Sequence, residues 1–73
     1  MNILEILDKP GRYIASNRQI YEVEKGGTIY ILNQFSTVGP YWSKIVYDQN
    51  YKYIDCGLHY DLKPLTFNKV NTL

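Results

Sequence analysis

The chain has 73 residues, of which 45% are hydrophobic and 21% charged, and its formal net charge is +1. This balance is typical of a globular protein and excludes the highly charged, weakly hydrophobic composition of disordered chains. A single domain of this size leaves little core volume for a deep catalytic pocket. Acidic and basic residues are interspersed along the chain, which disfavours a strong electrostatic footprint for nucleic acid or anionic lipid.

Compartment and origin can be inferred from the same composition. Cys56 is the single cysteine, so no internal disulfide is expected and a reducing compartment fits best. The first residues lack a secretory signal pattern, and no apolar run reaches membrane-spanning length. We therefore expect a cytoplasmic protein without membrane contact. Abundant Tyr, Ile, Asn and Lys are typical of AT-rich coding sequence, as found in low-GC bacteria, bacteriophages and other mobile elements.

The first predicted element is a short helix. Asn2 and Glu5 have the spacing of a capping box, which predicts a helical turn over residues 3–7. Pro10 and Gly11 end it, because the residue before proline avoids the helical region and glycine permits a turn. A helix this short is stable only when it packs against other parts of the protein.

Short runs of β-branched and aromatic residues follow from Arg12 onward, separated by turn residues, which predicts a small antiparallel β-domain. A turn at Asn17 and Arg18 joins the first two runs. The stretch QIYEVEKGGTIYIL predicts a hairpin with a three-residue loop that ends at a left-handed Gly27, since this register separates apolar residues from acids. The core face would hold Tyr21, Val23, Ile29 and Ile31, and the outer face Glu22, Glu24, Thr28 and Tyr30.

The stretch from Ser43 to Cys56 predicts another hairpin, with a two-residue turn at Gln49 and Asn50. That register sets Lys44 opposite Asp55, a cross-strand pair suited to a solvated face. It places Ile45, Ile54 and Cys56 in the core, and turns Val46, Tyr51, Tyr53 and Trp42 outward.

The last predicted strand covers residues 58–63, after which Leu65 and Phe67 are expected to fold over an open end of the sheet. The resulting fold class is mainly β: five to six short antiparallel strands in a curved sheet or barrel of SH3-like or OB-like size, with a short N-terminal helical turn. Residues 1–67 form one domain in this prediction, and residues 68–73 form a frayed tail.

Catalytic and metal-binding chemistry finds little support in the sequence. Cys56 and His59 could act as nucleophile and base, but residues three apart on a strand point to opposite faces. Structural zinc needs several Cys or His ligands, and this chain has one of each. We therefore expect no catalytic residues, no metal site and no cofactor, and so no enzyme.

Partner binding is the function that the aromatic residues favour, because tyrosine and tryptophan are preferred at protein interfaces. The leading hypothesis is a non-enzymatic protein-binding module, such as a phage or mobile-element inhibitor that masks a host or defence protein. The candidate interface residues are Tyr30, Trp42, Tyr51, Tyr53, Glu22, Glu24 and Lys44.

Three alternatives remain open at this point. The same rings, with Arg18, Lys44 and Lys52, could stack the bases of a single-stranded nucleic acid on a small barrel. The rings could instead be covered by the helix or the tail and serve packing alone. An unpaired edge strand could also pair with a second copy of the chain.

Overall fold

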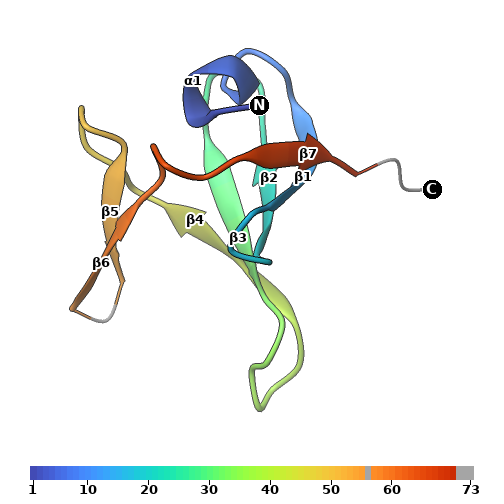
Figure 1. Ribbon diagram of the computed structural model, residues 1–73. Coiled ribbons are helices and arrows are strands. Elements are labelled where there is room, and N and C mark those ends of the chain that lie inside the picture. The colour runs from blue at the N-terminus through green and yellow to red at the C-terminus, as the bar shows by residue number, and fades with distance from the viewer. Residues whose placement is uncertain (56, 71–73) are drawn as a thin grey trace.

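The computed structural model describes residues 1–55 and 57–70. Within them, one short helix and seven strands form an open, curved β structure (Figure 1). The elements are α1 (Ile3–Ile6), β1 (Gly11–Ala15), β2 (Ile20–Val23), β3 (Ile29–Asn33), β4 (Tyr41–Ile45), β5 (Lys52–Asp55), β6 (Leu58–Asp61) and β7 (Phe67–Lys69). Antiparallel pairing gives a five-stranded sheet in the order β4-β3-β2-β1-β7 and a separate β5–β6 hairpin. The predicted mainly β class is confirmed, as an open sheet and not as a closed barrel.

The helix α1 begins as the sequence predicts. The Glu5 N–H donates a hydrogen bond of 3.0 Å to the Asn2 side-chain oxygen, and the Asn2 N–H donates one of 3.0 Å to the Glu5 carboxylate. This capping box satisfies N–H groups that the helix itself leaves unpaired. Ile3 and Ile6 are buried, so the single turn is held by packing against the sheet. In the described part of the chain, no helix combines the length and apolar character needed to cross a bilayer.

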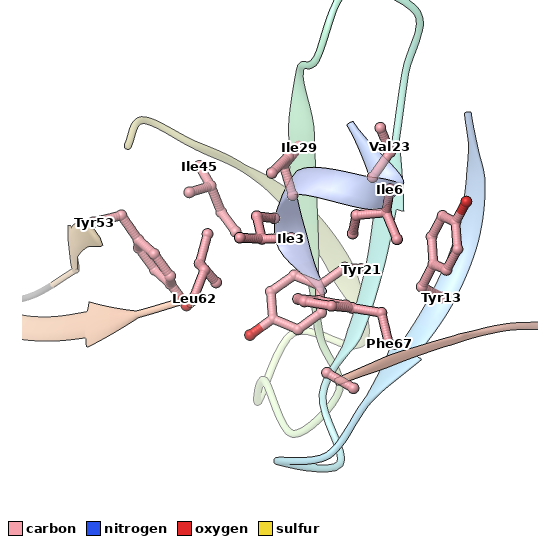
Figure 2. Close-up of a cluster of buried hydrophobic side chains, with 11 residues drawn as sticks. Ile3, Ile6, Tyr13, Tyr21, Val23, Ile29, Ile45, Tyr53, Leu62 and Phe67 are labelled. Atoms are coloured by element: carbon pink, nitrogen blue, oxygen red, sulfur yellow. The ribbon is translucent and has the colours of Figure 1, made fainter. Parts of the chain in front are cut away.

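The hydrophobic core lies on one face of the five-stranded sheet (Figure 2). Side chains from α1 and from the β5–β6 region meet the inward-facing side chains of the sheet there. Tyr21 and Phe67 pack edge to face with ring centroids 5.5 Å apart. The buried residues are Ile3, Ile6, Tyr13, Ala15, Tyr21, Val23, Ile29, Ile45, Tyr53, Leu62 and Phe67. Both covering elements therefore occupy the same side of the sheet.

Three hairpin loops share one backbone pattern. In each, the residue that precedes a three-residue loop donates its N–H to the carbonyl of the residue that follows the loop. Its own carbonyl accepts a hydrogen bond from the N–H of the third loop residue. The closing bonds run from Ala15 N–H to the Gln19 oxygen (2.9 Å), from Glu24 to Thr28 (2.8 Å) and from Asp48 to Lys52 (2.9 Å). The third loop residues are left-handed: Arg18 with φ of 67°, Gly27 with φ of 85° and Tyr51 with φ of 60°.

The β2–β3 register predicted from the sequence is confirmed. Tyr21 lies opposite Ile31 and Val23 opposite Ile29, with Gly27 at the left-handed position. A one-residue slip would have moved this whole apolar set to the other face.

The predicted hairpin between Ser43 and Cys56 is wrong in both pairing and register. β4 pairs with β3, whereas β5 pairs with β6, and a single bridge joins Tyr47 to Tyr53. The loop has three residues instead of two, so Asp48 lies opposite Lys52. The shift by one residue exchanges the two faces. Tyr53 is buried, while Ile54, predicted to be in the core, is 65% exposed.

Two other assignments in this region are confirmed. Ile45 is buried and Val46 is exposed, as predicted. The predicted burial of Cys56 falls outside the described residues.

The C-terminal segment is more ordered than the sequence suggested. Asn68 and Lys69, assigned to a frayed tail, belong to β7 and pair with β1. The Val70 N–H also donates a hydrogen bond of 2.8 Å to the Arg12 carbonyl. Phe67 is buried as expected, and its burial anchors this extra strand. Residues 71–73 of the predicted tail lie outside the described part of the chain.

Candidate functional site

The sheet face opposite the core carries two rows of side chains that run across β1, β2, β3 and β4. One row is apolar: Ile14 lies opposite Ile20, and Leu32 lies opposite Trp42. Because Tyr21 is paired with Ile31, the next positions, Ile20 and Leu32, are also neighbours. These four residues therefore form a continuous apolar row from one strand to the next.

The second row is charged and aromatic. Arg12 lies opposite Glu22, Glu22 opposite Tyr30, and Tyr30 opposite Lys44. The Arg12 guanidinium makes a salt bridge of 3.3 Å to the Glu22 carboxylate and lies 5.0 Å from the ring centroid of Trp42. Arg12 thus links the two rows through a cation–π contact.

We call these two rows the outer face. Its residues are Arg12, Ile14, Ile20, Glu22, Tyr30, Leu32, Trp42 and Lys44. None of them belongs to the buried core: Ile14 is 42% exposed, whereas Ile20, Leu32 and Trp42 are partly exposed. Since α1 and the β5–β6 hairpin both pack on the opposite side of the sheet, no helix or strand of the described residues covers the outer face. A contiguous apolar surface of this kind marks interaction sites in small proteins.

Four of the predicted interface residues come together on this face. They are Tyr30, Trp42, Glu22 and Lys44, from three adjacent strands. Glu24 is exposed just beyond the end of β2, where its backbone closes the β2–β3 loop. Tyr30 and Trp42 therefore lie on one face of the sheet, beside Glu22 and Lys44.

Tyr51 and Tyr53 do not belong to this surface, and their predicted outward orientation is wrong. Tyr53 is buried among core side chains, and Tyr51 packs against the core with its ring stacked on Tyr47 at 5.9 Å. Burial, followed by the neighbouring Tyr21, raises the pKa of the Tyr53 hydroxyl above its usual value. Both tyrosines therefore serve packing, which was one of the alternatives for the aromatic residues.

Sequence reasoning missed the apolar row itself. Ile14 alternates with the buried Tyr13 and Ala15, so strand periodicity alone assigns it to the outer face. Leu32 is assigned to the outer face in the same way, because the preceding Ile31 packs against the core. Ile14 and Leu32 are aliphatic, whereas the predicted interface contained only aromatic and charged residues.

The β3–β4 loop, residues 34–40, holds two further apolar side chains that the prediction did not include. Phe35 is 92% exposed and Val38 is 87% exposed. This loop extends from the end of the sheet away from α1 (Figure 1). An apolar residue within a run of turn-forming residues, as in QFSTVGP, is the sequence signal that marks such a loop.

His59, the one histidine of the chain, lies apart from this face. His59 is exposed on β6 and lies opposite Ile54. Cys56, its proposed partner, falls outside the described residues. Across residues 1–55 and 57–70, no three His, Asp or Glu side chains are grouped as metal ligands would be.

No protein-family model matches the chain, and comparisons with curated proteins and with solved structures found no significant match.

Proposed function

We propose that this chain is a non-enzymatic protein-binding module and that the outer face is its interface. The observation that carries the proposal is the contiguous, at least partly exposed apolar row of Ile14, Ile20, Leu32 and Trp42. Burying this row against a partner would remove apolar surface from water at about 25 cal/mol per Å². The row of Arg12, Glu22, Tyr30 and Lys44 beside it supplies the polar border that protein interfaces have around an apolar centre.

The charge pattern favours a protein partner over a single-stranded nucleic acid. Among the described residues, Arg12 is paired with Glu22, and Lys44 is the cation of the outer face that has no ion pair. Lys52 lies on the separate β5–β6 hairpin opposite Asp61, which offsets its charge. Nucleic-acid binding draws most of its affinity from cations that contact phosphates, and this face has few to offer.

The partner class follows from size and composition. A small domain that presents one apolar face can act by occupying the functional surface of a larger protein. The composition, rich in Tyr, Ile, Asn and Lys, is compatible with a bacteriophage or mobile-element origin. We therefore propose a cytoplasmic inhibitor that masks a host or defence protein.

Affinity capture tests the proposal. The tagged chain is incubated with lysate of a low-GC bacterial host, with and without nuclease, and the retained proteins are quantified. We expect a stoichiometric protein partner that survives nuclease treatment. Trp42→Ala should weaken that complex by about 2 kcal/mol or more, as the loss of a central aromatic anchor does.

The control is Ile54→Ala, which removes an exposed apolar side chain from the β5–β6 hairpin and should leave capture unchanged. Retention that disappears with nuclease would place nucleic acid on the outer face and overturn the proposal. A chain that binds only to itself would instead indicate pairing of two copies, for which β4, one of the two edge strands of the five-stranded sheet, is a candidate.

A further inference from the structure

A polar groove lies on the opposite side of the sheet from the outer face, with one end beside the β5–β6 hairpin and the other beside the β3–β4 loop. It consists of two adjoining hollows of about 430 and 450 Å³, which share Gln19 and Asn33 in their linings. Each hollow falls within the range of about 300–1,000 Å³ that small-ligand sites occupy. The groove is independent of the outer face, with which it shares no residue.

Two amide side chains in the groove are held in place by hydrogen bonds. The Asn33 amide nitrogen donates to the Tyr41 carbonyl at 3.1 Å and to the Ser43 hydroxyl at 2.8 Å. Asn17 donates to the Tyr21 hydroxyl at 3.1 Å and accepts from the Gln19 N–H at 3.0 Å. Fixed polar groups bind a ligand with a smaller loss of conformational entropy than mobile ones.

Several polar groups of the groove remain available to a ligand. Among the described residues, no hydrogen bond engages the Asn33 side-chain oxygen, the Gln19 amide or the Asp55 carboxylate. The Asn33 oxygen is a neutral acceptor and the Asp55 carboxylate is a charged one. The Gln19 amide can both donate and accept hydrogen bonds.

A flat aromatic surface borders these groups. Tyr53 and Tyr60 are stacked, with ring centroids 4.8 Å apart and an interplanar angle of 17°. Tyr53 is buried and Tyr60 is 37% exposed, and both residues line the first hollow. Tyr41, which is 49% exposed, lines the adjoining hollow.

The charge of the groove restricts the ligand. Asp55 is the one charged residue among the described residues that line the two hollows, and no lysine or arginine lines either. An anionic ligand such as a nucleic acid or a phosphorylated peptide would therefore meet a carboxylate and no cation.

From these observations we propose that the groove binds a neutral oligosaccharide. Pyranose rings present apolar C–H faces that pack on aromatic rings, and hydroxyl groups that exchange hydrogen bonds with amides and carboxylates. Tyr60 supplies the ring in this arrangement, while Gln19, Asn33 and Asp55 bind the hydroxyls. Two connected hollows fit consecutive sugar units, because a chain of rings fills an elongated groove.

A titration followed by ¹H–¹⁵N NMR tests this proposal on the intact wild-type chain. Maltohexaose, cellohexaose and chitohexaose are added separately, each to about 10 mM, which exceeds the millimolar Kd expected of a weak site. At least one sugar should shift the side-chain amide signals of Gln19 and Asn33 and the backbone signal of Tyr60. The absence of shifts with all three sugars, or shifts confined to the outer face, would overturn the proposal.

Two variants then identify the binding groups for the sugar that shifts these signals. Gln19→Ala and Asp55→Asn alter side chains outside the core, and each should raise the Kd by about tenfold. Lys44→Ala, on the outer face, is the matched control and should leave the Kd unchanged. An unchanged Kd in both groove variants would also overturn the proposal.

Discussion

The β2–β3 loop and the loop between Asp48 and Lys52 close with the same pair of backbone hydrogen bonds, but different residues occupy their left-handed positions. Gly27 adopts its φ of 85° without steric cost, because it has no Cβ. Tyr51 adopts a φ of 60° at a cost and is held there by its stacking on Tyr47 and its packing against the core. The first loop is therefore specified locally, whereas the second depends on tertiary contacts.

The largest expected effect on stability is at Tyr53, which the loop between Asp48 and Lys52 places in the core, in contrast to the exposed Ile54. Tyr53→Ala should destabilise the protein by about 3–5 kcal/mol, because it leaves a cavity in the core. Ile54→Ala should cost less than about 1 kcal/mol, since 65% of this residue is already exposed. Urea unfolding followed by circular dichroism measures both. A larger loss for Ile54→Ala would favour the two-residue turn at Gln49 and Asn50.

A smaller effect is expected at the locally specified loop. Gly27→Ala should destabilise by about 1–2 kcal/mol, because alanine is strained at positive φ. The added Cβ would lie 3.5 Å from the Tyr47 hydroxyl oxygen, which is ordinary contact, so backbone strain is the source of the loss. The change in urea midpoint gives the value. An unaltered midpoint would show that Gly27 is not left-handed in solution.

Arg18 provides the opposite substitution in a loop of the same geometry. Arg18→Gly should stabilise the protein by roughly 0.5 kcal/mol, since relief of the left-handed strain exceeds the extra entropy of glycine in the unfolded chain. Arg18 is exposed, so little packing is lost. The thermal midpoint of unfolding is the measurement, and a decrease would contradict the assigned loop.

The smallest effect is a dependence on pH at Asp48. The N–H groups of Lys52 and Asn50 donate to the Asp48 carboxylate at 3.1 and 2.8 Å and hold its pKa below the usual 3.8. Because the folded-state pKa is the lower one, this charge stabilises the fold above the unfolded-state pKa, and the stabilisation is lost as pH falls through the folded-state value.

The comparison variant for that effect is Asp48→Asn, which retains an oxygen acceptor without the charge. We expect wild type to unfold at a higher urea concentration than Asp48→Asn at neutral pH, and the difference to shrink in strong acid. A difference that stays constant with pH would show that the charge of Asp48 does not stabilise the loop.

Local signals in the sequence determined the helix, the β class and one hairpin register. The capping pattern of Asn2 and Glu5 marked α1, and Gly27 marked the β2–β3 loop, because each feature depends on residues close together in the chain. Alternation along β3 and β4 placed Tyr30, Trp42 and Lys44 on the outer face for the same reason.

Tertiary structure alone decided the partners of β4 and β5 and the position of β7. The aromatic residues near Tyr53 fit either face, so periodicity could not distinguish two registers that differ by one residue. The pairing of Asn68 with Ile14 joins segments that are far apart in the chain. Such contacts form only when the whole core is assembled. For this reason the proposed groove, which is lined by residues of the sheet, the β5–β6 hairpin and two hairpin loops, could not be predicted from the sequence.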